Sequence, residues 1–171
     1  MAPSIFSRKR DLLYLIFFTI HLPIIFAVDI YPLYPSSLQA NWMGQLRLWY
    51  ISTYRDQFFT EPPAWFTMYM WMELLYHVPL CVWAILALVR GDDEMVPVHL
   101  LVYAVQTALT TATCVADYLA WEGVSAEVKM GLGGLYVPYL AVSVFMGVDM
   151  FGRLSNRLRG QAGADLAKKR L

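Results

Sequence analysis

Charged residues are scarce in this sequence. They make up 15% of its 171 residues, against roughly 25% in an ordinary soluble domain, whereas 58% of the residues are hydrophobic. A single small domain has too little interior to hide that much apolar surface from water. The scarcity of charge therefore excludes an ordinary water-soluble domain and predicts a protein that lies in a bilayer.

Other features that the sequence lacks narrow the class of protein further. The formal net charge is zero, so no overall field attracts nucleic acid, and no nucleic-acid partner is expected. Cys81 and Cys114 are the only cysteines, and both fall in apolar runs. This placement favours packed thiols over a disulfide framework or a metal site. The sequence has no Asn-x-Ser/Thr acceptor for N-glycosylation. We expect no cofactor and no metal.

Four apolar stretches are each long enough, at about 20 residues, to cross the hydrocarbon core as a helix. They cover residues 12–31, 64–89, 96–119 and 132–151. Lipid offers the backbone no hydrogen-bond partner, and the stretches lack the alternation of strands. They predict an all-α membrane protein, a four-helix transmembrane bundle. The first stretch follows RKRD, so a cleaved signal peptide is an alternative interpretation of it.

The expected organisation is an N-terminal tail (1–11), a membrane domain (12–151) and a basic C-terminal tail (152–171). Ten of the thirteen Lys and Arg residues lie in the two tails and the short second loop. The positive-inside rule therefore predicts that both termini are cytosolic. Lys168 and Lys169, fourth and third from the end, resemble a dilysine retrieval signal of the endoplasmic reticulum. A solvated basic tail that touches anionic lipid is the alternative.

The first luminal loop, residues 36–61, contains a further helical pattern. Leu38, Trp42 and Trp49 belong to an apolar series with three- and four-residue steps. The series predicts an amphipathic helix capped by Ser36 or Ser37, lying in the headgroup zone or over the luminal mouth of the bundle.

Prolines occur in all four predicted spans. Pro23 and Pro79 lie well inside theirs, so we expect them to kink the helices and to open a cavity. The alternative is that proline is simply frequent in membrane helices.

Two acids, Asp29 and Glu73, lie within predicted spans that contain no Lys or Arg. A charge at such a depth is costly unless it faces a partner or a cavity. We therefore expect the two to share one proton, with Glu73 as its carrier, in a ligand pocket. Helical spacing turns polar and aromatic residues of all four spans towards them, including His21, Met70, His77, Thr110, Tyr136 and Tyr139.

A carboxylate in a cavity lined by aromatic side chains favours binding of a lipophilic amine, or of a sterol whose hydroxyl hydrogen-bonds the acids. The alternative is that the polar residues only hold the helices together by hydrogen bonds. Asp117 and Asp149 lie close to span ends, where we expect ordinary hydration at the membrane interface.

HLPIIFAVD (21–29), LWY (48–50), EPPAWF (61–66), MELLYHVP (72–79) and YVPYL (136–140) resemble the EXPERA family. The resemblance implies a homodimeric, non-enzymatic receptor of the endoplasmic reticulum membrane that binds sterols and cationic amphiphilic drugs. It implies that Asp29 pairs with a ligand amine and that Glu73 holds Asp29 by a hydrogen bond. It also implies a cavity lined by His21, Trp49, Tyr50, Tyr54, Thr110, Tyr136 and Tyr139.

Two alternatives stay open within the family. The family also contains the emopamil-binding sterol isomerases. Their pattern is a His with a Glu four residues later on the second helix, and another Glu on the third helix. Here Glu73 precedes His77, and the third span offers Gln and Thr. The other alternative is a lipid or protein chaperone in cholesterol handling, with a Niemann-Pick type cholesterol transporter as its partner.

Overall fold

The structure is a computed structural model that describes residues 3–168, and side chains as far as residue 162. Regular structure in this part of the chain is entirely helical, as the lack of hydrogen-bond partners in lipid requires. Four segments are long and apolar enough to cross a membrane, and they confirm the four predicted spans: Lys9–Asp29, Ala64–Arg90, Val96–Ala120 and Ala126–Ala162.

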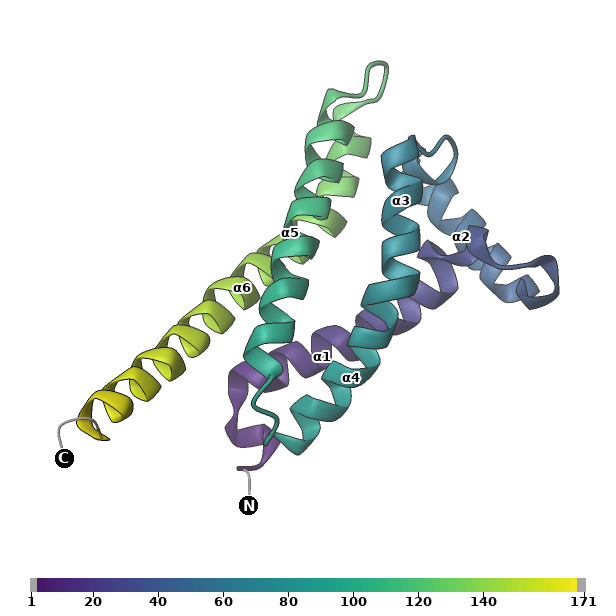
Figure 1. Ribbon diagram of the computed structural model, residues 1–171. Coiled ribbons are helices and arrows are strands. Elements are labelled where there is room, and N and C mark those ends of the chain that lie inside the picture. Colours follow the sequence, from purple (N-terminus) through teal and green to yellow (C-terminus); the bar gives the residue numbers. More distant parts are fainter. Residues whose placement is uncertain (1–2, 169–171) are drawn as a thin grey trace.

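The bundle consists of two helix pairs with a small helix outside them. The α-helices of residues 3–168 are α1 (Lys9–Ile24), α2 (Asn41–Tyr54), α3 (Ala64–Met72), α4 (Val78–Arg90), α5 (Val96–Ala120) and α6 (Ala126–Lys168). α5 and α6 run side by side over most of α5, and α1 packs against α4 (Figure 1). α6 passes close to α5 at Gly147, where a Cβ would lie 3.6 Å from the Cβ of Ala104, an ordinary van der Waals contact.

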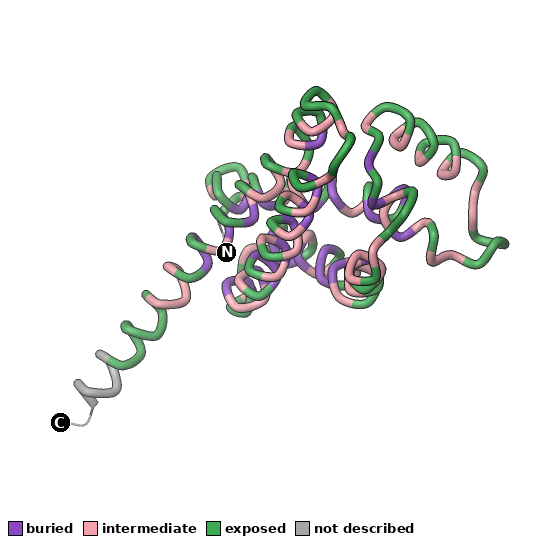
Figure 2. Tube along the Cα trace, turned by 90° about the horizontal axis from the view of Figure 1, so that it is seen from above, coloured by how far each residue is buried: buried purple, intermediate pink, exposed green. Residues whose placement is uncertain are grey.

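The core lies where the two pairs meet. Tyr14 and Phe18 of α1 are fully buried against Cys81 of α4 and Tyr103 of α5. Both cysteines are free and buried, as expected for packed thiols. Figure 2 shows the buried residues on the inner sides of the helices. Many large apolar side chains point outward instead, as lipid-facing residues of a membrane bundle do.

Two π-helical turns lie in the first and second spans of the described chain. Ile25–Asp29 forms the end of the first span and begins two residues after Pro23. Glu73–His77 joins α3 to α4 and ends two residues before Pro79. Proline has no amide hydrogen, so each ladder of hydrogen bonds loses a bond close to these turns. α4 is inclined to α3 (Figure 1), which confirms the predicted kink in the second span.

The loop helix α2 exists, but its predicted start is wrong. Ser36 and Ser37 lie in a separate 3-10 turn, Ser36–Leu38, and α2 begins at Asn41 without a side-chain cap. It ends at Tyr54, and the next residue, Arg55, has a left-handed φ of 50°. Trp42 and Trp49 are more than half exposed, as befits a helix at a membrane interface. α2 lies beside α3, at the edge of the molecule (Figure 1).

The last helix is longer than predicted. α6 begins at Ala126 and continues to Lys168, through most of the segment 152–171 that was expected to be a tail. Residues 156–162 are exposed and stand clear of the bundle (Figure 2). Lys169 and the side chain of Lys168 lie outside the described residues, so the retrieval signal stays a prediction.

The expectation that Asp149 is hydrated at the interface is wrong. Asp149 is buried, with 8% exposure, and belongs to an ionic cluster at the end of the bundle that carries both termini (Figure 1). The cluster consists of Arg8, Arg10, Asp11, Asp149 and Arg153. Asp149 pairs with Arg153, which is four residues further along α6, and with Arg10 of α1. The first pair has ordinary helical spacing, whereas spacing along the chain could not reveal the second.

Candidate functional site

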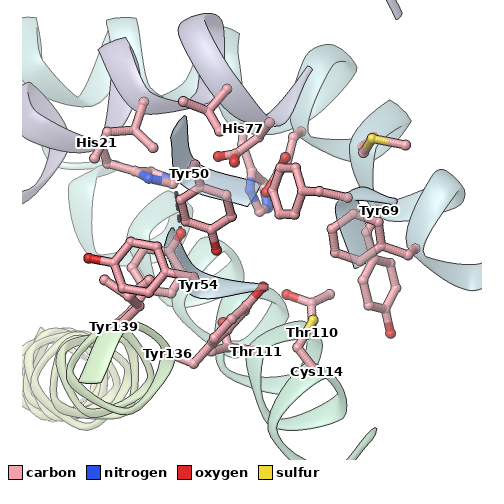
Figure 3. A pocket seen from close by; sticks show the side chains of 18 of the residues that line it. His21, Tyr50, Tyr54, Tyr69, His77, Thr110, Thr111, Cys114, Tyr136 and Tyr139 are labelled. Atoms are coloured by element: carbon pink, nitrogen blue, oxygen red, sulfur yellow. Dashed lines mark hydrogen bonds between the residues drawn. The ribbon is translucent and has the colours of Figure 1, made fainter. Parts of the chain in front are cut away.

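A cavity of about 440 Å³ lies between the helices at the level of the two π-helical turns. Figure 3 shows aromatic rings and polar groups from several helices pointing into it. All eleven residues predicted to bind a ligand line this cavity: His21, Asp29, Trp49, Tyr50, Tyr54, Met70, Glu73, His77, Thr110, Tyr136 and Tyr139. The structure brings them together, and their role in binding stays a prediction.

The two acids owe their place to the π-helical turns. Asp29 is the last residue of one turn and Glu73 is the first residue of the other. A π-helical turn adds a residue to the helical repeat and re-aims the side chains around it, and such turns are frequent at functional sites. Both carboxyl groups line the same cavity. The hydrogen bonds of the described residues include none between Asp29 and Glu73, so the direct bond that the resemblance implied is not seen.

Two histidines occupy the inner end of the cavity in different ways. The His21 ring nitrogen Nε2 is 2.8 Å from the Tyr139 hydroxyl, which is in turn 3.3 Å from the Tyr103 hydroxyl. The His77 ring packs on Tyr103 at 4.8 Å between centroids. Both His77 nitrogens are buried and have no hydrogen-bond partner within the described part of the chain. Buried polar atoms normally have partners, so His77 offers hydrogen-bonding capacity to whatever enters.

Asp56 is a structural residue of this region that the sequence did not reveal. It is fully buried and accepts hydrogen bonds from the hydroxyls of two cavity-lining residues, Tyr50 (2.8 Å) and Tyr136 (2.9 Å). A third bond comes from the Phe58 amide at 3.0 Å. Asp56 therefore links α2 to α6. Burial raises the pKa of Asp56 above its usual value, and the three hydrogen bonds oppose only part of that rise.

Arg47 is the second residue that the sequence did not reveal. Its guanidinium donates hydrogen bonds to the carbonyls of Val28 (3.0 Å) and Phe59 (3.1 Å), and lies 4.6 Å above the Phe59 ring. These contacts anchor α2 beside the turn that carries Asp29. Burial lowers the pKa of Arg47, and the charge of Asp29 opposes this effect. A cation from the loop thus lies near the acid at the end of the first span.

The sequence held only a weak signal for these two residues. Asp56 precedes a short 3-10 turn and caps it through Phe58, a local pattern typical of aspartate. Nothing in the spacing of the loop shows that it folds back onto the fourth span. The long-range partner Tyr136 was predicted for the cavity, but without its bond to Asp56.

The described residues include no group of three or more His, Cys, Asp or Glu placed to hold a metal ion. The cavity instead combines two acids, two histidines and hydroxyls with a mostly aromatic and aliphatic wall. Such a site can take an apolar body and one or two polar groups. Fold and site together define an integral membrane protein with a cavity that two acids line.

Comparison with known proteins identifies the family. The sequence model of EXPERA, the expanded EBP superfamily, matches residues 42–150, and the chain belongs to this family. It is 33% identical over 152 residues to Efficient mitochondria targeting-associated protein 19 of Schizosaccharomyces pombe, covering 84% of this chain and 76% of that protein. It is 24% identical over 155 residues to Sigma intracellular receptor 2 of Xenopus tropicalis, covering 86% and 91%.

The match to the human protein is similar in extent. Over 146 residues the chain is 25% identical to Sigma intracellular receptor 2 of Homo sapiens, covering 79% of this chain and 83% of that protein. The resemblance read from EPPAWF and the mid-span acid is confirmed by these matches. The chain is a multi-pass membrane protein with receptor-named relatives.

Proposed function

We propose that this protein is a receptor of the endoplasmic reticulum membrane that binds a sterol or a lipophilic amine in the cavity between its π-helical turns. One observation carries the proposal: Asp29 and Glu73 line a single cavity whose other walls are mainly aromatic and aliphatic. The receptor name carried by relatives from frog and human supports it.

The chemistry of the wall favours these two ligand classes. An ammonium group gains from a carboxylate and from the faces of nearby aromatic rings, here those of Tyr50 and Tyr54. A sterol has one hydroxyl, which the acids or His77 can hydrogen-bond, and a rigid apolar body for the remaining wall. The volume of about 440 Å³ falls within the range of about 300–1,000 Å³ found for drug-sized ligands.

Equilibrium binding to the purified protein tests this proposal. A hydrogen bond to a charged group contributes about 1.5–3 kcal/mol, so Asp29→Asn should weaken binding of a lipophilic amine by about tenfold or more. Binding of an uncharged sterol should change less. Asp117→Asn is the control, because Asp117 lies on α5 and bonds Trp121 instead of lining the cavity. Unchanged amine affinity in both Asp29→Asn and Glu73→Gln would refute the proposal.

A sterol isomerase is the second candidate, and His77 is the observation in its favour. Double-bond migration needs one group to donate a proton and another to remove one. Glu73 and His77 line the same cavity one turn apart, and both His77 nitrogens lack a protein partner among the described residues. Incubating the purified protein with a sterol that has a double bond in its ring system, and separating substrate and product by gas chromatography, distinguishes the two candidates: double-bond isomers have the same mass but different retention times, and a receptor returns the sterol unchanged.

A chaperone is the third candidate, and the name of the fission yeast relative, which refers to mitochondrial targeting, favours keeping it. A role in sterol homeostasis, a homodimer and a Niemann-Pick type cholesterol transporter as partner belong to the proposal as well. Crosslinking in intact cells, followed by identification of the captured proteins, tests these partners.

Replacing Lys168 and Lys169 by Ser tests retention in the endoplasmic reticulum: we expect the variant protein to reach the cell surface.

A further inference from the structure

A second cleft lies far from the acidic cavity, at the end of the bundle that carries both termini. It has a volume of about 350 Å³, and α1 and α6 form it through Arg10, Phe145, Val148, Asp149, Gly152, Arg153 and Asn156. Phe145 and Val148 are 45% and 70% exposed, as lipid-facing side chains are. Asp149 and Arg153 follow on the next turns of α6, and Arg10 faces them from α1. The cleft therefore lies across the boundary between an apolar and a charged surface.

The ionic cluster leaves positive charge at this cleft. It contains three arginines and two aspartates, so its net charge is +1. Arg10 is the most accessible arginine, since 67% of its side chain is exposed, against 15% for Arg8 and 30% for Arg153. Arg10 donates to Asp149 through Nη1 at 2.7 Å. A guanidinium has five N–H donors, so most of those on Arg10 remain available to a ligand.

We infer that this cleft binds the headgroup phosphate of an anionic glycerophospholipid, in the leaflet on the side of the termini, with Arg10 as the main contact. A phospholipid carries its phosphate directly above its acyl chains, which matches charged residues that follow apolar ones along α6. The guanidinium fork fits two phosphate oxygens at once. A free phosphate would use Arg10 but leave Phe145 and Val148 uncovered. The inference does not depend on the ligand of the acidic cavity.

Native mass spectrometry of the full-length protein with equal amounts of palmitoyl-oleoyl phosphatidylserine and phosphatidylcholine tests this site. We expect the wild type to retain phosphatidylserine preferentially. An arginine near an anionic surface contributes about fivefold in affinity, so Arg10→Gln should reduce that preference by about fivefold. Lys9→Gln is the matched control, because it removes the same charge from an exposed neighbour that does not line the cleft.

Arg10→Lys is the second variant. It keeps the charge, and hence the cluster, but an ammonium lacks the fork, so it should reduce the preference by a smaller factor. Asp149 keeps its bonds from Arg153 and Tyr14 in both variants, so they should fold, which a thermal melt verifies. Three results would overturn the inference: no preference in the wild type, equal losses in Lys9→Gln and Arg10→Gln, or displacement of the lipid by equimolar glycerophosphoserine or inorganic phosphate.

Discussion

Replacing Asp56 by Ala should be among the most destabilising changes outside the membrane spans. The substitution removes three hydrogen bonds, from the Tyr50 hydroxyl, the Tyr136 hydroxyl and the Phe58 amide. A net value of about 1 kcal/mol for each bond gives about 3 kcal/mol in all. For a chain of this size, 1 kcal/mol corresponds to about 2–4 °C, so the melting temperature should fall by about 6–12 °C.

The assay is thermal unfolding of the purified protein in detergent. Glu61→Ala is the matched control: it removes an exposed acid from the same loop and should leave the melting temperature nearly unchanged. Asp56→Ala should also weaken amine binding, because α2 carries Tyr50 and Tyr54 over the cavity. In the Asp56→Ala background, Tyr136→Phe should lower the melting temperature little further, since the hydrogen bond between Tyr136 and Asp56 is already lost. A melting temperature for Asp56→Ala equal to that of Glu61→Ala would refute the role of Asp56 as the link between α2 and α6.

Two further predictions concern the charged groups. The folded state binds the Asp56 proton more tightly than the unfolded state, so the stability that this proton contributes is present below the unfolded pKa of about 3.9 and is lost as pH rises through the folded pKa. Asp56→Asn should remove this part of the pH dependence in thermal melts from pH 4 to 7; identical slopes in both proteins would contradict it. Asp149→Asn weakens the ion pair between α1 and α6 and should lower the free energy of unfolding by about 2 kcal/mol. Breaking a fully buried ion pair costs about 3–5 kcal/mol, and the loss is smaller here because Arg10 is largely exposed. Chemical unfolding in mixed micelles measures this loss, and Asp92→Asn in the exposed second loop is the control, expected to lose nothing.

The spans and the cavity could be predicted because both depend on local rules. Hydrophobic length identifies a membrane helix wherever it packs, and an uncompensated acid such as Glu73 must face a cavity or a partner whatever the details of the bundle. Helical spacing then places His77 on the same side as Glu73. These arguments need no knowledge of how the chain turns back on itself.

The contacts between distant segments could not be predicted in this way. Asp56 meets Tyr136 across 80 positions, and Arg10 meets Asp149 across 139. Neither pair produces a periodic pattern in the sequence, because each contact depends on the path of the loops and on how the helices cross. The π-helical turns are a similar case: Pro23 and Pro79 indicated a disturbance of the helix, but not that it would place an acid on each widened turn.

The length of α6 has a consequence for the far end of the chain. At about 1.5 Å per residue, its 43 residues extend over about 65 Å, roughly twice the thickness of the bilayer's oily interior. An unbroken rod of that size cannot lie flat on the surface after crossing it. The part of α6 beyond the crossing, as far as Lys168, therefore extends away from the lipid instead of along its surface.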